Sequence, residues 1–503
     1  MNDPLNLSMF RAYDIRTPSA RLDDELARRL ARAEAVYFRD VLGVDEVLVA
    51  HDARLSGPRY LSIGVEAFRE AGLDVALLPG VSSTCGFYHA AAQRAGAAAV
   101  MFGASHNPAG DTGQKLLAPG ARPIARGIGP EGGLDRIRAL YESGAARGSA
   151  RRGRVRPLET MDEYVRESMA LAEVEPGSLR ATRVLHDYVH GAAGREMMRA
   201  FELAGAELEP LHFAPDGRFP LGAPNPVKPD VIREGLDALR RGDFLFGAFF
   251  DGDGDRIDFY RGDGTYVSSS FVYAAILPEI RRRFAGAGWG VFADLKCNPL
   301  AVIEMAGSGV AVDVIRNGHS QIKQTMFDDP SRFGAVEESA HFYEAFPGPG
   351  GARCCTENTL YVALLVARVW RDQPERFDRL IEIERTSVRL REWGYKFPTD
   401  AARAKALEAV ERHFAARGAS VFHRMRNGMD LEATLMRRGL PLEIAPGARL
   451  PDDWLQVCQR VSQSENGLAR WEVCGARAEE VAEAKRAIAD CARRCGAGEE
   501  YRG

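Results

Sequence analysis

The sequence has few cysteines, no excess of positive charge and no long apolar run. Its 503 residues include eight cysteines, which form neither a disulfide framework nor paired CxxC zinc knuckles. Lys and Arg number 66 against 70 Asp and Glu, so the formal net charge of −4 supplies no global attraction for nucleic acid. No segment has the ~18 consecutive apolar residues that would span a bilayer, and MNDPLNLSMFRAYDIR at the N-terminus has no secretory pattern. We therefore expect a cytoplasmic protein with free thiols that binds neither nucleic acid nor membrane.

Length and apolar content indicate several globular domains. Apolar residues make up 46% of the chain, and at roughly 150 residues per domain the length suggests three or four domains. Three apolar strands end in similar acidic turns, in the stretches VLVAHDARLSG (47–57), RVLHDYVHGAAG (183–194) and GVFADLKCNP (290–299). A helix-like stretch and another apolar run follow each of them, as in βαβ units. The alternative is that strand-then-Asp recurs by chance, since Asp is common in turns.

These patterns predict a specific architecture. We expect an α/β fold of three similar doubly wound α/β domains in series plus a smaller C-terminal α+β domain. The predicted boundaries are 1–157, 158–265, 266–375 and 376–503. Nothing in the composition indicates an oligomeric state.

The stretch FFDGDGDR contains three aspartates at alternate positions, Asp251, Asp253 and Asp255. Glycines between them let the backbone curl, so the carboxylates can turn toward one point and bind a hard divalent cation. A calcium EF-hand loop would need Gly and Glu where Arg256 and Gly262 stand. A short loop between two strands leaves coordination positions open, which suits Mg²⁺ completed by phosphate or water. The alternative is a plain acidic β-turn.

A second signal is the stretch GASHNP, which directly follows the apolar run AAAVMF (97–102). Ser105 then lies at the carboxyl end of a strand, where open α/β sheets place ligands. The hydrolase elbow GxSxG is excluded because Asn107 stands in place of its last glycine. We expect Ser105 and His106 to point apart, as sequence neighbours usually do, and Lys115 to neutralise phosphate charge near the serine. The alternative is a capping serine.

Taken in order, the motifs resemble a known family. SHNP with a downstream Lys, the DGDGDR loop, the FRAYDIR opening, NGHS (317–320) and EESAH (337–341) are together similar to the α-D-phosphohexomutase superfamily, in its phosphomannomutase/phosphoglucomutase branch. The resemblance runs nearly end to end. It implies a Mg²⁺-dependent phosphohexomutase that interconverts the 6-phosphate and 1-phosphate of mannose and/or glucose. Phosphoserine 105 and a hexose 1,6-bisphosphate, which is also the activator, would carry the phosphate.

The same resemblance implies roles for individual residues. The implied catalytic residues are Ser105, Lys115, Arg256, His319 and Arg16. The implied metal ligands are Ser105, Asp251, Asp253 and Asp255. The implied substrate-binding residues are Tyr13, Lys296, Glu337, Ser339, His341, Arg460, Ser462, Gln463 and Ser464. A histidine with a near-neutral pKa would suit proton transfer. The resemblance also implies that the domains surround a central cleft. We expect this cleft to be lined, around phosphate and Mg²⁺, by the cations Arg16, Lys115, Arg256, Lys296, Lys323 and Arg460.

Two loops depart from the pattern of the resemblance. The usual Gly-Glu-x-Ser-Gly-His is replaced by residues 336–341, where Val336 and Ala340 take the places of glycines and Glu338 adds a carboxylate. The second loop, residues 460–464, falls where the resemblance places a phosphate-binding Arg-x-Ser-Asn-Thr, and here Gln463 and Ser464 replace the Asn and the Thr. Because epimers differ by one or two hydrogen bonds, the choice between mannose and glucose stays open. The same motifs are also compatible with a phosphoglucosamine mutase, a phosphatase, or a catalytically silent paralogue that binds sugar phosphates.

Overall fold

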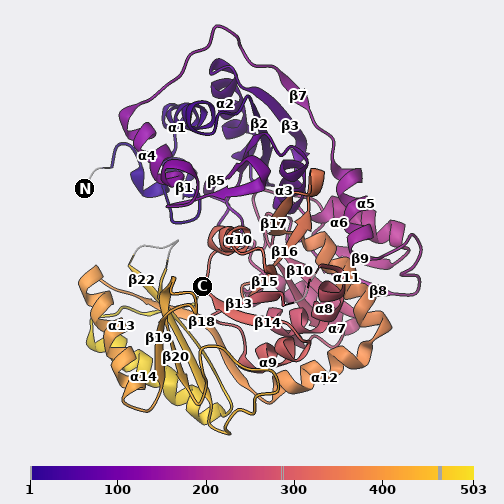
Figure 1. Cartoon of the computed structure of the whole chain (residues 1–503), viewed down its shortest axis with the longest axis vertical. Coiled ribbons are helices and arrows are strands. Elements are labelled where there is room, and N and C mark those ends of the chain that lie inside the picture. The colour runs from indigo at the N-terminus through magenta and orange to yellow at the C-terminus, as the bar shows by residue number, and fades with distance from the viewer. Residues whose placement is uncertain (1–2, 285, 287, 463–466, 503) are drawn as a thin grey trace. The chain divides into compact units, whose positions relative to one another are not determined.

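The computed structural model describes residues 3–284, 286, 288–462 and 467–502 (Figure 1). The chain forms two compact units, and each draws on several segments. The first unit comprises Met1–Val267, His319–Pro330 and Ser339–Asp372. The second comprises Ser268–Gly318, Ser331–Glu338 and Gln373–Gly503. Across the described ranges, no helix is both long and apolar enough to cross a membrane.

The N-terminal sheet of the first unit has the order β1-β5-β4-β2-β3-β7, with β6 paired to β5. Its strands are β1 Ile15–Pro18, β2 Glu46–His51, β3 Asp74–Val81, β4 Ala98–Phe102, β5 Asp111–Ala118, β6 Arg122–Ile124 and β7 Val155–Pro157. Its helices are α1 Asp24–Val36, α2 Gly57–Glu70, α3 Thr84–Gln93 and α4 Leu134–Ser143. The chain passes from β2 to β3 and then returns to β4 on the other side of β2, and all three strands are parallel. The topological switch point therefore lies between the carboxyl ends of β2 and β4.

The second sheet of this unit has the order β12-β11-β10-β8-β9. Its strands are β8 Arg183–Asp187, β9 Glu207–Leu211, β10 Phe246–Phe250, β11 Ile257–Arg261 and β12 Tyr266–Val267. The accompanying helices are α5 Met161–Leu171, α6 Gly194–Ala204 and α7 Pro229–Arg241. Parallel β8 separates β9 from β10, so this sheet repeats the switch of the first one. The DGDGD loop joins antiparallel β10 and β11, which confirms that it connects two strands.

The remaining elements of the first unit come from later in the chain. They are α10 His319–Asp328, the antiparallel hairpin of β16 His341–Pro347 and β17 Arg353–Glu357, and α11 Thr359–Asp372. Stacking of Trp370 from α11 on Phe246 from β10 shows that these segments share the core of the unit, at a ring separation of 5.5 Å.

The second unit contains two sets of strands. Parallel β13 Gly290–Asp294 lies between β14 Ala311–Ile315 and β15 Arg332–Glu337, with α8 Ser269–Phe284 and α9 Pro299–Gly307. The C-terminal sheet has the order β19-β20-β21-β22-β18-β23. Its strands are β18 Val388–Lys396, β19 Ser420–Arg424, β20 Asp430–Arg438, β21 Leu455–Val461, β22 Leu468–Gly475 and β23 Glu500–Arg502. The helices are α12 Pro374–Arg385, α13 Asp400–Ala415 and α14 Ala478–Arg494.

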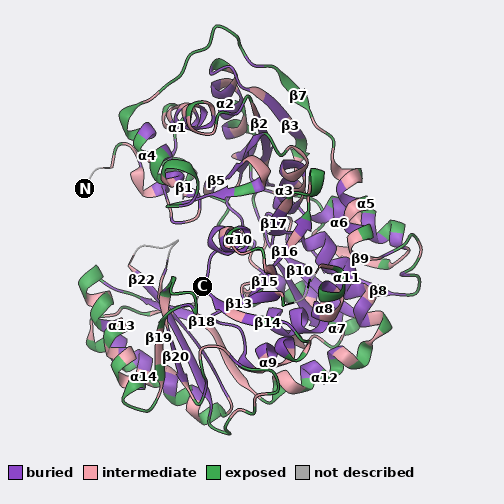
Figure 2. Cartoon of the chain, in the orientation of Figure 1, coloured by how far each residue is buried: buried purple, intermediate pink, exposed green. Residues whose placement is uncertain are grey.

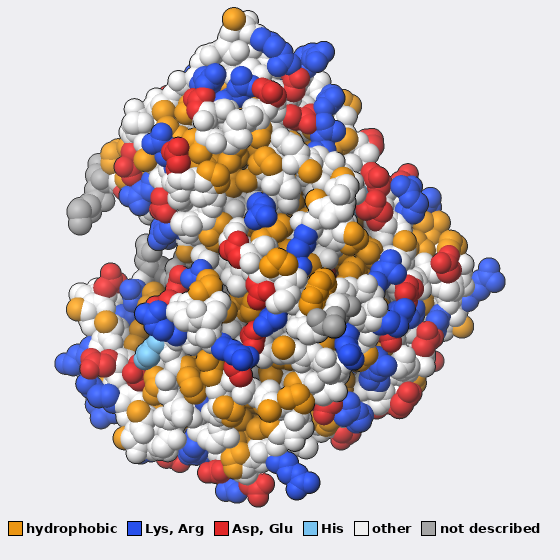
Figure 3. Space-filling view, in the orientation of Figure 1, with side chains coloured by type: hydrophobic (Ala, Val, Ile, Leu, Met, Phe, Trp, Pro, Cys, Tyr) orange, Lys and Arg blue, Asp and Glu red, His pale blue; other side chains and the backbone are white. Residues whose placement is uncertain are grey.

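Burial follows from these layers. Buried Trp471 and Val457 of the C-terminal sheet share one apolar core with Ile488 of α14 and Val410 of α13. Figure 2 shows buried strands in the sheets and exposed outer faces on α13 and α14. On the face drawn in Figure 3, Lys and Arg side chains are interleaved with Asp and Glu. All eight cysteines lie within the described residues as free thiols, as expected. The prediction of an α/β fold with repeated sheets is confirmed.

The repeated acidic turn is a true structural repeat. Asp52 directly follows β2, Asp187 and Asp294 end β8 and β13, and each aspartate is at most 2% exposed. In all three turns the aspartate Oδ1 accepts a 3.0 Å hydrogen bond from the backbone N–H two residues later. The same bond closes the turn after three strands that each lie between two parallel neighbours, which supports a structural repeat.

We expect replacement of Glu196 by glutamine to stabilise the protein above neutral pH. Glu196 lies in the first turn of α6 with 7% exposure, and burial raises its pKa from 4.5 to about 7. The stability that this group contributes is therefore complete below about pH 4.5 and is lost as the pH rises through 7. Glu196→Gln stays neutral, so at pH 8 it should exceed the wild type by on the order of 1–3 kcal/mol in unfolding free energy.

Thermal denaturation at pH 4 and pH 8 measures this difference, which should almost vanish at the lower pH. Glu202→Gln, at an exposed position of the same helix, is the matched control. Equal behaviour of the two variants at pH 8 would contradict the effect of burial at Glu196.

Candidate functional site

Ser105 follows β4 in a left-handed turn. Its φ is +47° and it is 2% exposed. Its Oγ donates a 2.7 Å hydrogen bond to Oδ2 of Asp251, 146 residues away in the sequence. The two most informative motifs of the sequence, SHNP and DGDGD, are thereby brought into direct contact.

His106 lies close to the serine hydroxyl, and the expectation that the two side chains point apart is wrong. The left-handed turn places His106 Nδ1 3.2 Å from Ser105 Oγ. Since the hydroxyl gives its only proton to Asp251, Nδ1 of His106 is the donor in this contact. Burial, with Arg256 next, holds the pKa of His106 well below its usual range. The ring is therefore neutral.

The three aspartates of the DGDGD loop form a compact, buried set of oxygen ligands. Asp251, Asp253 and Asp255 are at most 1% exposed, and one ligand oxygen from each lies within 4.8 Å of the others. Within the described residues, Oδ1 of Asp253 and Oδ1 of Asp255 are buried without a hydrogen-bond partner. Oxygen donors of this kind suit a hard divalent cation. The residues present therefore fit Mg²⁺.

Lys115 contacts the same loop. Its Nζ lies 2.6 Å from Oδ2 of Asp253 and 2.5 Å from Oδ2 of Asp255. Burial opposes the charged ammonium, but the two carboxylates raise the pKa of Lys115 well above its ordinary value. Burial and the neighbouring Asp253 and Asp255 raise the pKa of Asp251. For Asp255, burial is outweighed by Lys115 and Arg256, which lower its pKa.

The glycines of the loop serve contact as well as curvature. A Cβ at Gly252 would lie 2.7 Å from the carbonyl oxygen of Ser105, closer than real Cβ atoms approach. Gly254 has φ +73° and faces Ala193, which a Cβ would approach to 2.7 Å. The loop between β10 and β11 (251–256) is called the acidic loop, and the loop between β4 and β5 (103–110) is called the serine loop. Only glycine at position 252 lets the backbones of these two loops touch.

Arg256 and His341 form the next layer of the site. Arg256 Nε donates to Nε2 of His341 over 3.0 Å, so the ring carries its proton on Nδ1. That nitrogen lies 3.5 Å from Oε1 of Glu357 and 3.9 Å from Oδ1 of Asp255. These three side chains are close enough to surround a metal ion, but a protonated Nδ1 cannot ligate one. We therefore assign no metal ion to this group of side chains.

Lys323 is buried within the first unit. It is 1% exposed, and its Nζ donates to the hydroxyl of Tyr88 at 2.8 Å and to Oε2 of Glu357 at 3.0 Å. Lys323 thus pairs with a buried carboxylate that also lies 3.5 Å from His341, and its part in lining a cleft stays a prediction. Burial raises the pKa of Glu357 to about 7, while Lys323 opposes the shift. Nothing in the sequence around Glu357 indicated this pair.

The FRAYDIR opening reaches the serine loop through Arg16. Its Nε pairs with Oδ2 of Asp14, and its Nη1 donates to Oδ1 of Asn107, both over 2.7 Å. The ring of Tyr13 meets the ring of His319 edge-on at 6.0 Å. Burial and nearby cations, Lys323 foremost, hold the pKa of His319 well below its ordinary value instead of near neutrality. Its Nε2 has no partner among residues the structure describes.

In the second unit, predicted residues gather at the carboxyl ends of β13, β14 and β15. Lys296 Nζ lies 3.8 Å from Oδ2 of Asp294, which also accepts a hydrogen bond from the amide of Asn317. The same amide donates to Oε1 of Glu337 at 3.2 Å. Burial raises the pKa of Asp294 to about 7, against the effect of Lys296. The NGHS and EESAH motifs are thus joined through Asn317.

Glu338, which departs from the pattern of the resemblance, has a partner inside the second unit. It is 2% exposed, and its Oε2 lies 2.8 Å from Nη1 of Arg389 on β18. Arg389 also pairs with Glu472 of β22, and Ser270 of α8 donates to the other oxygen of Glu338. The extra carboxylate is therefore neutralised by this buried network.

The predicted phosphate loop is described only in part. Arg460 Nε donates to Oε1 of Glu392 at 2.9 Å, and Arg470 lies 3.2 Å from the other carboxylate oxygen. Burial would raise the pKa of Glu392, but Arg460 and Lys296 lower it to about 2. Ser462 is buried, whereas Gln463 and Ser464 lie outside the described residues. Ser339 is half-buried in the first unit.

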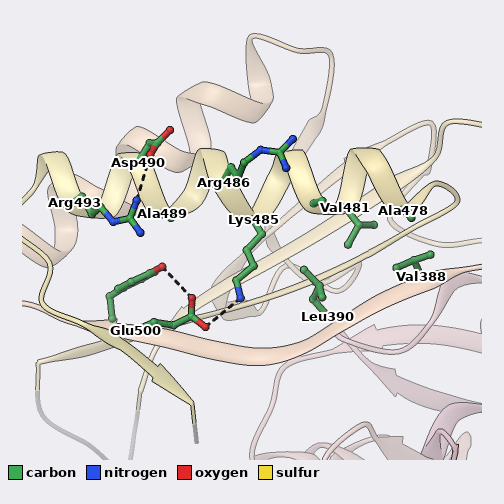
Figure 4. A pocket seen from close by; sticks show the side chains of 12 residues that line it. Val388, Leu390, Ala478, Val481, Lys485, Arg486, Ala489, Asp490, Arg493 and Glu500 are labelled. Atoms are coloured by element: carbon green, nitrogen blue, oxygen red, sulfur yellow. Dashed lines mark hydrogen bonds and ion pairs between the residues drawn. The ribbon is translucent and has the colours of Figure 1, made fainter.

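A separate pocket of 520 Å³ lies between α14 and β18, near β23 (Figure 4). Lys485 points toward Glu500, with a 3.1 Å hydrogen bond, and Arg493 pairs with Asp490 at 3.7 Å. The pocket contains none of the residues predicted for the site.

Ala340 adopts a conformation that favours glycine. Its φ is +73°, and its carbonyl accepts a 3.0 Å hydrogen bond from the backbone N–H of Ile257. The resemblance places glycine here, so the backbone has kept the left-handed geometry although the residue type has changed. A side chain at such a position is strained by roughly 1 kcal/mol.

We expect Ala340→Gly to leave the melting temperature unchanged or raise it slightly. Relief of strain offsets the greater freedom of glycine in the unfolded chain. Ala335→Gly, at a buried strand position in β15, is the matched comparison and should lower the melting temperature. Differential scanning calorimetry compares the variants, and an equal loss at both positions would refute strain at Ala340.

Comparison with known proteins finds two matching domains and several homologues. Residues 7–129 match phosphoglucomutase/phosphomannomutase alpha/beta/alpha domain I, and residues 162–264 match domain II. A phosphomannomutase of Vibrio cholerae is 28% identical over 68% of this chain and 73% of its own. A phosphomannomutase/phosphoglucomutase of Pseudomonas putida is 29% identical over 67% and 69%. A family protein from Burkholderia thailandensis has the same fold, with a TM-score of 0.78, 22% identity and coverage of 98% and 99%. The chain therefore contains domains I and II of the phosphoglucomutase/phosphomannomutase type, and its phosphomannomutase homologues identify it as a mutase, an enzyme of the isomerase class.

Proposed function

We propose that this mutase interconverts the 6-phosphate and 1-phosphate of a hexose, mannose and/or glucose, through a phosphate carried on Ser105. The observation that supports this most strongly is the 2.7 Å contact between Ser105 Oγ and Asp251, beside two more buried aspartates and Lys115. A nucleophilic oxygen beside a cluster able to balance phosphate charge is what phosphoryl transfer requires.

The proposed reaction has two transfers. In the first, a substrate hydroxyl forms a bond to phosphorus, the bond from phosphorus to Ser105 Oγ breaks, and the hydroxyl proton passes to a base. Neutral His319, whose Nε2 has no partner in the described part of the chain, is suited to take that proton. The resulting hexose 1,6-bisphosphate then turns over in the site. Ser105 Oγ forms a bond to the phosphorus of its other phosphate, the bond from that phosphorus to the sugar oxygen breaks, and the sugar oxygen takes the proton from the base. The same bisphosphate would activate an unphosphorylated enzyme.

Several positive charges would stabilise the transferred phosphate. Asp251, Asp253 and Asp255 would hold Mg²⁺, which supplies charge neutralisation when bound. Arg256 and Lys115 lie against the same loop, so both can interact with phosphate oxygens. Arg16 would orient the serine loop through Asn107.

The remaining predicted residues would bind the substrate. We assign sugar hydroxyls to Tyr13, Lys296, Glu337, Ser339 and His341. We assign the non-transferring phosphate to Arg460, Ser462, Gln463 and Ser464. In this proposal residues 1–157 carry the serine, 158–265 the metal loop, 266–375 the sugar-binding residues and 376–503 the phosphate-binding residues. Binding both phosphates of one intermediate favours its retention until the second transfer.

Replacement of Ser105 by alanine tests the nucleophile. With mannose or glucose 1-phosphate and hexose 1,6-bisphosphate, we expect turnover to fall by roughly three orders of magnitude or more. Phosphorus NMR follows the substrate, the product and free phosphate together. Ser143→Ala, at an exposed position at the end of α4, is the control and should behave as the wild type.

Full activity of Ser105→Ala would exclude Ser105 as the phosphate carrier. Release of free phosphate without isomerised product by the wild type would instead identify a phosphatase. Tight binding without turnover would identify a silent paralogue. Comparison of kcat/KM for mannose, glucose and glucosamine 1-phosphates decides among the sugars.

Replacement of Asp253 by asparagine tests the metal site. The variant keeps the shape of the side chain but removes one negative ligand, so we expect at least about tenfold weaker Mg²⁺ binding. Titration calorimetry measures binding directly, and the Mg²⁺ concentration for half-maximal activity should rise in parallel. Asp263→Asn, in the exposed turn between β11 and β12, is the matched control. Unchanged Mg²⁺ affinity in Asp253→Asn would place the metal elsewhere.

A further inference from the structure

A buried pair, Asp52 and Arg54, follows β2 and has no role in the function proposed above. Asp52 is 0% exposed and Arg54 is 1% exposed. Although the stretch HDARLSG looks like an ordinary strand-end turn, the guanidinium of Arg54 reaches across the switch point to the serine loop. It donates to the backbone carbonyls of Ser105 at 2.7 Å, Asn107 at 2.6 Å, Pro108 at 2.5 Å and Asp111 at 3.1 Å.

Asp52 completes the contact from the other side. Its Oδ2 accepts from Nε of Arg54 at 3.2 Å and from the backbone N–H of Ala104 at 3.1 Å. A Cβ at Gly103 would lie 2.5 Å from the same oxygen, so the carboxylate presses directly on the start of the serine loop. The pair therefore binds both the donors and the acceptors of that loop's backbone.

The loop needs such support because its nucleophile is in an unfavourable conformation. Ser105 has φ +47°, a region that residues with a side chain seldom occupy unless surrounding contacts hold them there. Arg54 binds the carbonyl of this residue, and Gly252 lies against the same carbonyl oxygen. Loss of the guanidinium would free that peptide to rotate, and the Oγ of Ser105 would leave Asp251.

A third contact limits the movement of Arg54 itself. Its Cζ lies 5.2 Å from the ring centroid of Phe219, in the segment between β9 and α7. A Cβ at Gly217 would come within 2.4 Å of the backbone on either side of Arg54. Further along the same segment, Pro224 accepts a hydrogen bond from the backbone N–H of Gly252. Arg54 thus lies between the serine loop and the segment that connects β9 to α7, which also contacts the acidic loop through Pro224.

The three repeated acidic turns show that the Arg54 side chain is not needed to form the turn itself. In all three repeats the aspartate binds the backbone N–H two residues later, where the residues are Arg54, Val189 and Lys296. Since valine and lysine serve the turn equally, the turn does not require arginine. A change of the Arg54 side chain leaves the backbone bond of the turn available, which makes the position suitable for a test.

We propose that Arg54, oriented by Asp52, is a positioning residue for phosphoryl transfer: it fixes Ser105 in the left-handed conformation that directs Oγ toward Asp251. This inference rests on the proposed function of Ser105. Five donors in one plane allow a guanidinium to bind several carbonyls together, and a lysine ammonium cannot reproduce that arrangement.

The test compares Arg54→Lys with Arg59→Lys. Arg59 is an exposed residue of α2 that pairs with Asp24, so it serves as the control. For Arg54→Lys we expect kcat to fall by about 10- to 100-fold while KM for the sugar phosphate changes less than about threefold, because misplacement of the nucleophile affects the transfer and not the binding. The control should keep wild-type values.

A second variant separates positioning from folding. Arg54→Ala leaves a space for a guanidinium ion, so millimolar methylguanidinium should restore at least about tenfold of the lost kcat, whereas methylammonium should not. Circular dichroism follows the fold in parallel. Wild-type kcat in Arg54→Lys, a loss expressed in KM alone, or a loss in Arg54→Ala that methylguanidinium does not reverse would overturn the proposal.

The same samples keep the two proposals apart. Peptide mapping by mass spectrometry after incubation with glucose 1,6-bisphosphate reports phosphate on Ser105. If wild type and Arg59→Lys turn over without it, the proposed function of Ser105 fails. If they carry it and Arg54→Lys keeps wild-type kcat, the positioning role of Arg54 fails alone.

Discussion

Burial of three aspartates side by side is the constraint on which the first unit depends. Asp251, Asp253 and Asp255 have almost no contact with solvent, so their charge must be met by nearby cations. Lys115, from a different sheet, contacts two of them, and Arg256 lies against the third. The serine hydroxyl, the glycine contact at the acidic loop and the switch points of two sheets are all arranged around this charge. Such a centre is ready to accept a cation and a phosphate together.

The sequence predicts those parts of the site whose residues are neighbours in the chain. Alternating aspartates and glycines, a serine after an apolar strand and the repeated acidic turn each carry their signal locally, and the structure has all three. Arg54, Glu357 and Glu392 carry none, because their partners lie 51, 34 and 68 residues away. Lys323 illustrates the converse. It lies beside a motif that suggested phosphate binding, whereas the structure pairs its ammonium with buried Glu357. The adjacent Ser105 and His106 approach each other only because of a backbone conformation that residue types do not reveal.

Where the sequence departs from the motifs of the phosphohexomutases that it resembles, the structure shows compensation. Ala340 keeps the left-handed backbone that glycine would adopt with less strain. Glu338 is neutralised by Arg389, which links the strand-end loop of β15 to the C-terminal sheet within one unit. Arg389 in turn binds Glu472, so the added carboxylate belongs to a buried network of alternating charge. These changes concern the loop that the proposal gives to sugar recognition, and they leave the serine and the three aspartates untouched.

A single-turnover chase tests most directly whether Ser105 hands its phosphate to the sugar. Enzyme labelled with radioactive phosphate from hexose 1,6-bisphosphate is mixed with unlabelled hexose 1-phosphate and quenched after milliseconds to seconds. The predicted result is label on the peptide that contains Ser105, moving into sugar phosphate at a rate no slower than kcat. Label on another peptide, or transfer to the sugar slower than kcat, would contradict a phosphoserine mechanism at this site.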